Sequence, residues 1–138
     1  KFYYESASKA ADKSANANLV ATDFVTRMDY AYSIADLVIS RAGASSISEL
    51  CLLGKPSVLV PSPNVAEDHQ TKNALALANK EAAVMVKDAE APDKLISTAL
   101  ELMGDEECLA KLSANVLAMA LPNSANKIAD VILNNLKK

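Results

Sequence analysis

Arg41-Ala42-Gly43-Ala44-Ser45-Ser46-Ile47-Ser48-Glu49 is the stretch that decides the fold, because an apolar run at residues 36–40 precedes it and a helical pattern at residues 46–53 follows. This order predicts a strand, a tight turn at Gly43 and the start of a helix. A glycine lets the backbone turn sharply, and the free amide groups of a helix start, aided by the helix dipole, can bind a phosphate. The first functional hypothesis is therefore a nucleotide or phosphate ligand.

The same alternation of short apolar runs and helical patterns continues along the chain. Strands are expected at residues 19–21, 36–40, 57–60 and 82–86, and helices at residues 28–34, 46–53, 68–79, 92–103, 106–119 and 122–138. This alternation predicts an α/β fold, a parallel sheet with helices on its faces. The strands are continuous apolar runs, which predicts burial on both faces.

The amino end of the chain does not complete this pattern. A helix is expected at residues 2–13, but no strand precedes it, and the chain begins at Lys1 without an initiator methionine. We therefore expect the sheet to lack its first strands and the chain to be a fragment of a longer protein.

Composition limits the possible functions. The 138 residues, half of them apolar, are enough for one core, so a single domain over residues 1–138 is expected. The net charge is −3 and the basic residues are scattered, which argues against nucleic acid or an anionic membrane surface as a partner. Cys51 and Cys108 lack the spacing of a disulfide framework or zinc site and suit reduced cytosolic thiols. No apolar run approaches the roughly 18 to 20 residues that cross a bilayer.

In a parallel α/β sheet, ligands bind beyond the carboxyl ends of the strands, so the loops that follow the strands carry the candidate residues. Two interpretations of Glu49 are open. Ser46-Ile47-Ser48-Glu49 has the spacing of a capping box, and Glu49 could equally accept hydrogen bonds from the vicinal hydroxyls of a ribose. Arg41, just after a strand, could lie near a phosphate or pair with a carboxylate.

A second loop, residues 61–70, is long and ends in polar side chains. His69 is the only histidine and lacks a catalytic relay at a recognisable spacing, so it could be an ordinary surface residue. Together with Gln70, it could instead recognise sugar hydroxyls. Asp68 is a possible cap of the following helix. The glycine turn matches neither the three-glycine dinucleotide pattern nor the Walker pattern, so a nicotinamide cofactor and ATP hydrolysis are not supported.

Several motifs, in their order and spacing, resemble one family along the whole chain. They are Thr22–Met28, Ala35–Ala44, Ser48-Glu49, Gly54–Ser57, Val60-Pro61 and Asp68–Ala74. They resemble the carboxyl-terminal half of the bacterial peptidoglycan glycosyltransferases that make lipid II, the undecaprenyldiphospho-muramoylpentapeptide β-N-acetylglucosaminyltransferase (MurG) family. A match in several parts is more specific than any single motif.

The resemblance implies the Rossmann-like carboxyl-terminal domain of a type B glycosyltransferase, which binds the UDP-GlcNAc donor. It implies transfer of N-acetylglucosamine to the C4 hydroxyl of lipid-linked muramoyl pentapeptide, with no metal or cofactor, by a peripheral enzyme at the cytoplasmic face of the membrane. The acceptor domain, with the catalytic base and the membrane contact, would lie outside this chain, which alone should be inactive. Carried over by motif, the implied ligand residues are the Val25 backbone for uracil, Gly43, Ala44, Ser45 and Ser46 for the diphosphate, Glu49 for the ribose, and His69 and Gln70 for N-acetylglucosamine.

The sequence departs from the family at two points. The family often has glutamine where His69 stands, and its Gly-Gly-Ser loop at the start of this domain is absent. Two alternatives stay open: the donor domain of another UDP-sugar transferase, and a non-catalytic nucleotide-binding or interaction module.

Overall fold

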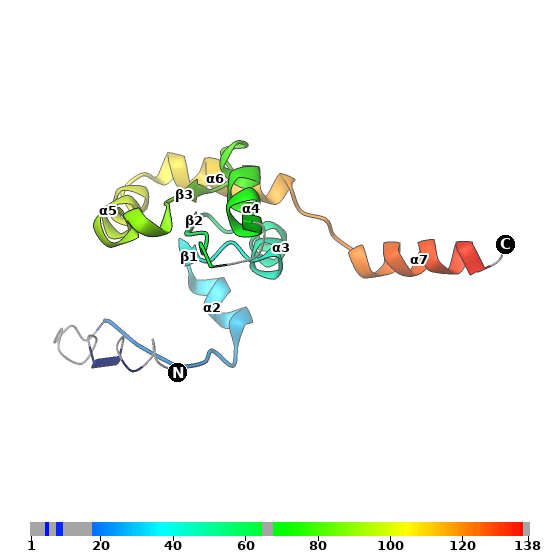
Figure 1. The fold of residues 1–138 in the computed structure, drawn as a ribbon, viewed down its shortest axis with the longest axis horizontal. Coiled ribbons are helices and arrows are strands. Elements are labelled where there is room, and N and C mark those ends of the chain that lie inside the picture. The colour runs from blue at the N-terminus through cyan, green and yellow to red at the C-terminus, as the bar shows by residue number, and fades with distance from the viewer. Residues whose placement is uncertain (1–4, 6–7, 10–17, 65–67, 137–138) are drawn as a thin grey trace. The chain divides into compact units, whose positions relative to one another are not determined.

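The computed structural model describes residues 5, 8–9, 18–64 and 68–136 (Figure 1). The chain divides into two compact units, Lys1–Ile34 and Ala35–Lys138. In the first unit, helix α2 (Met28–Ile34) has the bounds that the sequence predicts. The helix predicted at residues 2–13 lies mostly outside the described residues, although Glu5, Ser8 and Lys9 are helical.

The predicted strand at residues 19–21 is wrong. These residues have no regular secondary structure, and Leu19 and Val20 are 53% and 84% exposed. A strand is stabilised by hydrogen bonds to a neighbour and by the burial of its side chains. Neither is found at this segment, so its apolar composition alone does not make it a strand.

The second unit contains a parallel sheet in the order β1-β2-β3. Its strands are β1 (Val38–Ser40), β2 (Ser57–Leu59) and β3 (Val84–Met85). The register pairs Ile39 with Val58 and Leu59 with Met85. The described residues thus form three of the four predicted strands, each shorter than expected. Only β2 is buried along its whole length, because it alone has a strand on each side.

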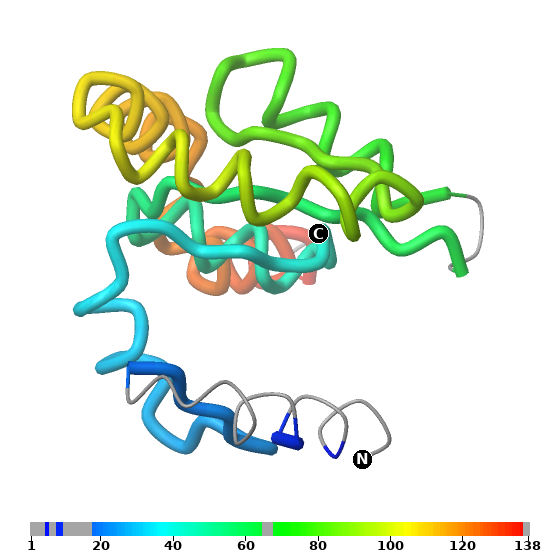
Figure 2. The backbone as a smooth tube through the Cα atoms, turned by 90° about the vertical axis from the view of Figure 1, so that its left-hand side faces the viewer, coloured from blue at the N-terminus to red at the C-terminus, as the bar shows by residue number. Residues whose placement is uncertain are grey.

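The helices are close to their predicted bounds. They are α3 (Ala44–Leu53), α4 (His69–Ala78), α5 (Ala91–Met103), α6 (Glu106–Ala118) and α7 (Ser124–Leu136), with a short 3₁₀ helix, η2 (Asp88–Glu90), before α5. In Figure 1, α3 and α4 lie on one side of the sheet and α5 on the other. Figure 2 shows the chain turning back from α5 into α6. The first turn of α6 is capped by the Asp105 side chain, which accepts a hydrogen bond from the Cys108 N–H.

One cluster of the core lies between the sheet and the helices α5 and α6. Its buried members are Val58, Val60, Val86, Leu102 and Leu112. Because the sheet is packed from this side and α3 and α4 cover the other, the carboxyl ends of the strands are held in fixed positions. The loops at that edge therefore have a rigid base.

Ser57 is the exception in this core. Its side chain is fully buried, and its Oγ has no hydrogen-bond partner among the described residues. A buried, unpaired hydroxyl costs about 1–3 kcal/mol, so we expect Ser57→Ala to raise the free energy of unfolding by about 1 kcal/mol. Urea denaturation at an unchanged m-value would measure this.

Ser113→Ala is the matched control, because the Ser113 Oγ donates a hydrogen bond of 2.7 Å to the Gly54 carbonyl. Its loss should lower stability by about 1 kcal/mol. If both substitutions destabilise the protein equally, the Ser57 hydroxyl is bonded in solution.

Candidate functional site

The turn between β1 and α3 leaves a helix start open. The first hydrogen bond of α3 runs from the Ile47 N–H to the Gly43 carbonyl, at 3.0 Å. The N–H groups of Gly43, Ala44, Ser45 and Ser46 therefore have no partner within the helix. Gly43 is the N-cap residue and, as a glycine, it has no side chain that could cap this end. Four adjacent donors at the positive end of a ten-residue helix suit an anionic ligand.

The capping-box interpretation of Glu49 is wrong. It requires Ser46 to be the N-cap, but α3 begins two residues earlier than predicted, at Ala44. Ser46 is thus the third helical residue, and Glu49 lies one turn further along on the same side. The Glu49 side chain is exposed, and its interpretation as a ligand residue stays a prediction.

The predicted reason for a glycine at position 43 also needs correction. Gly43 has φ −70° and ψ 148°, an extended conformation that any residue adopts. A Cβ there would meet only the Ser46 Oγ, at 4.0 Å. Neither the backbone nor the packing therefore requires a glycine at this position. What the glycine provides is open space beside the N–H groups at the start of α3, which a side chain would fill.

Arg41 joins the ends of the three strands. It follows β1, its Nη1 donates to the Val60 carbonyl after β2, and it forms an ion pair with Asp88 after β3. The sequence left open whether Arg41 lies near a phosphate or pairs with a carboxylate, and the structure shows the second. Its charge is balanced by Asp88, so we assign Arg41 to holding this edge of the sheet together.

The start of α4 carries the other predicted ligand residues. Asp68 occupies the N-cap position in a left-handed conformation (φ 55°), but its side chain makes no capping bond. The Gln70 Oε1 accepts a hydrogen bond of 2.9 Å from the Ser62 N–H. Because the donor is an N–H, the amide oxygen must face it, and the Nε2 of Gln70 is left as the group that can donate to a ligand. His69 is exposed.

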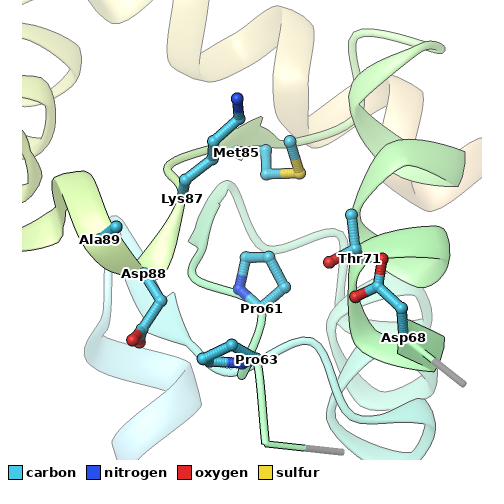
Figure 3. A pocket seen from close by; sticks show the side chains of 8 residues that line it. All are labelled: Pro61, Pro63, Asp68, Thr71, Met85, Lys87, Asp88 and Ala89. Carbon is cyan, nitrogen blue, oxygen red and sulfur yellow. The ribbon is translucent and has the colours of Figure 1, made fainter. Parts of the chain in front are cut away.

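A pocket of about 320 Å³ adjoins this helix start (Figure 3). It is lined by Pro61, Pro63, Asp68, Thr71, Met85, Lys87, Asp88 and Ala89. The lining comes from the loop after β2, the start of α4 and the segment after β3. It thus lies at the edge of the sheet where α/β proteins bind ligands.

Asn73 connects α4 to the glycine turn. Its Nδ2 donates a hydrogen bond of 3.1 Å to the carbonyl of Ala42, which is fully buried. Asn73 lies one turn after Gln70, so the bond brings the Gln70 end of α4 beside the open start of α3. The structure thus brings together the turn and the α4 start, two parts of the predicted site.

Other predicted features lie elsewhere or carry no chemistry. Val25, 38% exposed, belongs to the first unit, and its predicted contact with uracil stays a prediction. Burial raises the pKa of the Cys51 thiol, which keeps it protonated and unreactive. Within the described parts of the chain, no three His, Cys, Asp or Glu side chains gather as metal ligands would. The same parts contain no helix long and apolar enough to span a membrane.

Comparison with known proteins decides the family. Residues 3–132 match the model of the glycosyltransferase family 28 C-terminal domain. The chain belongs to glycosyltransferase family 28. Its match covers the β1–α3 turn, the α4 start and the whole sheet, so the site described above lies within the family 28 domain.

Named relatives in family 28 are similar along almost the entire chain. The UDP-N-acetylglucosamine--N-acetylmuramyl-(pentapeptide) pyrophosphoryl-undecaprenol N-acetylglucosamine transferase of Parabacteroides distasonis is 59% identical over 138 residues, which are 100% of this chain and 38% of the relative. The enzyme of the same name from Bacteroides fragilis is 57% identical over 134 residues, 96% of this chain and 35% of the relative. The chain thus spans little more than a third of these relatives.

The fold of this family 28 chain also matches a solved structure. The crystal structure of MurG from Acinetobacter baumannii superposes with a TM-score of 0.81 at 31% identity, covering 94% of this chain and 40% of that one. The predicted fold, a Rossmann-like parallel sheet with flanking helices from the carboxyl-terminal part of a type B glycosyltransferase, is confirmed.

Proposed function

We propose that this chain is the donor-binding part of a glycosyltransferase that moves N-acetylglucosamine from UDP-GlcNAc to the C4 hydroxyl of lipid-linked muramoyl pentapeptide, forming lipid II for peptidoglycan. The observation that carries the proposal is the start of α3, with a glycine at its N-cap, at the carboxyl edge of a family 28 sheet. The names of the similar enzymes from Parabacteroides and Bacteroides support the choice of donor and acceptor. We further propose that the whole protein works at the cytoplasmic face of the membrane, with the lipid-linked acceptor bound outside this chain.

The open helix start accounts for how the donor would be activated. When the bond from the sugar to UDP breaks, negative charge develops on the leaving diphosphate. The N–H groups of Gly43–Ser46 already point out of the helix start and need no rearrangement to stabilise that charge. Glu49 would accept the ribose hydroxyls one turn further along α3, and the backbone of Val25 would bind uracil.

The amide of Gln70 would recognise the sugar. Its oxygen is engaged by the Ser62 N–H, so its Nε2 would donate to an oxygen of N-acetylglucosamine, with His69 beside it. With this arrangement, Gln70 acts as the donor and the sugar as the acceptor of the hydrogen bond between them. It also gives the sugar a contact that UDP alone does not have.

Binding of the donor is tested by calorimetric titration with UDP-GlcNAc, with UDP, GDP and ATP as controls. The 138 residues are titrated alone and in a chimera in which they replace the aligned segment of the Parabacteroides distasonis transferase. We expect selective binding of the uracil nucleotides, and transfer by the chimera only. A folded chimera that binds no nucleotide, or binds GDP and ATP equally well, would overturn the proposal.

Gln70→Ala should weaken UDP-GlcNAc binding about 2- to 12-fold, the value of one neutral hydrogen bond, and leave UDP binding unchanged. Gln70→Glu is the informative companion, because a carboxylate still accepts the Ser62 N–H but cannot donate to the sugar. Both variants should therefore lose affinity for UDP-GlcNAc. Equal losses for UDP and UDP-GlcNAc would remove Gln70 from the sugar site.

A further inference from the structure

Asn73 makes a contact that the proposed donor site does not use directly. Its side chain is half-buried on α4, and its Nδ2 lies 3.1 Å from the carbonyl oxygen of Ala42. Ala42 is the residue before the N-cap of α3 and is fully buried. A buried carbonyl needs a hydrogen-bond partner, and at this position a side chain 31 residues away supplies it.

The orientation of the Ala42 peptide sets the direction of the donors that follow it. The Ala42 carbonyl and the Gly43 N–H belong to one planar peptide unit and point in opposite directions. When Asn73 fixes the carbonyl inward, the Gly43 N–H is fixed outward, beside the free N–H groups of Ala44 and Ser45. Without this bond the unit can rotate, and its carbonyl could turn toward an anion.

The same helix also holds the loop after β2. Gln70, three residues before Asn73, accepts the Ser62 N–H at 2.9 Å, so two amides on one side of α4 contact two different loops. The bond from Asn73 therefore sets the distance between the amide start of α3 and the sugar-binding start of α4.

We propose that Asn73 is a positioning residue for the diphosphate: by holding the Ala42 carbonyl, it keeps the N–H groups at the start of α3 directed at the nucleotide's phosphates. This inference rests on the proposed function, because it presumes that the turn binds a diphosphate. It predicts an effect confined to phosphate-bearing ligands, since Asn73 itself contacts the turn and not the nucleoside.

The test compares UDP with uridine as competitors of UDP-GlcNAc in the chimera described above. In Asn73→Ala we expect UDP to bind at least about tenfold more weakly, while the affinity for uridine changes less than about twofold. Asn73→Leu keeps a side chain of similar shape and favours helix, and it should give the same selective loss if the smaller residue impairs folding.

Asn115→Ala is the matched control. The Asn115 Nδ2 donates a hydrogen bond of 2.9 Å to the Glu81 carbonyl, 34 residues away and at the turn that precedes β3. Its loss should lower the unfolding temperature without changing the affinity for UDP. The proposal is overturned if Asn73→Ala leaves UDP binding intact, weakens uridine and UDP equally, or behaves as Asn115→Ala does. Absence of UDP binding in the unsubstituted chimera would instead refute the proposed function.

Discussion

Gly43→Ala should weaken UDP-GlcNAc binding about 5- to 150-fold without destabilising the fold. The extended backbone of Gly43 accepts alanine, and the new Cβ would approach only the Ser46 Oγ, at 4.0 Å. Loss of a glycine also reduces the entropy of the unfolded chain, which stabilises a protein by about 0.4–1 kcal/mol. The methyl group would, however, occupy space beside the free amides, and overpacking of that kind costs about 1–3 kcal/mol.

Gly54→Ala should affect stability and not the affinity for UDP-GlcNAc, the opposite of Gly43→Ala. Gly54 ends α3 in a left-handed conformation with φ 62°, and an added Cβ would lie 3.4 Å from the Cβ of Leu117. The left-handed conformation costs about 1–2 kcal/mol for a residue with a side chain. We therefore expect lower stability and unchanged affinity.

Urea denaturation and calorimetric titration of both variants in the same chimera separate the two roles. If Gly43→Ala binds UDP-GlcNAc as well as the unsubstituted protein, the diphosphate does not contact this turn. If Gly54→Ala also loses affinity in its folded state, binding responds to general changes at α3 and the comparison no longer isolates the turn.

The fold could be predicted where local signals agree with packing. The predicted end of the helix at residue 53 is confirmed, since Gly54 takes the left-handed conformation and its N–H donates a hydrogen bond to the Cys51 carbonyl. The parallel sheet follows from strands that alternate with helices, because such connections place successive strands side by side. The strand predicted at residues 19–21 was wrong because an apolar run becomes a strand only when a neighbouring strand pairs with it.

The start of α3 shows where local preference is overruled. Ser46 has a favoured capping side chain, and the capping box contributes only about 1 kcal/mol. Burial of Leu50 and Cys51 sets which side of the helix faces the core, and the short connection from β1 leaves room for the helix to begin at Ala44. The earlier start places the N–H groups that have no partner within the helix at residues 43–46.

The candidate ligand residues could be predicted from the sequence, but the long-range hydrogen bonds that hold them in place could not. The turn at residues 43–46 and Gln70 follow strands, and the rule that ligands bind at the carboxyl edge finds them. Asn73 and Asp88 were missed as partners because their bonds join residues 31 and 47 positions apart. No local spacing encodes such contacts; they arise when the sheet brings its loops together.

Glu49→Ala is expected to weaken binding of both UDP and UDP-GlcNAc by about 1.5–3 kcal/mol, roughly 12- to 150-fold, the contribution of hydrogen bonds to a charged group. The exposed Glu49 carboxylate lies one turn after Ser45 and Ser46, whose N–H groups belong to the open start of α3. Two oxygens at this place can accept both hydroxyls of a ribose whose diphosphate lies on the helix start.

UDP and 2′-deoxy-UDP distinguish a direct contact with the ribose from an indirect effect. The unsubstituted chimera should bind UDP more tightly than its deoxy analogue, and Glu49→Ala should bind the two equally, because the group that senses the hydroxyl is gone. Glu49→Gln retains one acceptor oxygen, so its preference for UDP over 2′-deoxy-UDP should lie between those of the unsubstituted chimera and Glu49→Ala. If Glu49→Ala weakens both nucleotides but keeps their full difference in affinity, the carboxylate acts on the helix start and another group binds the ribose.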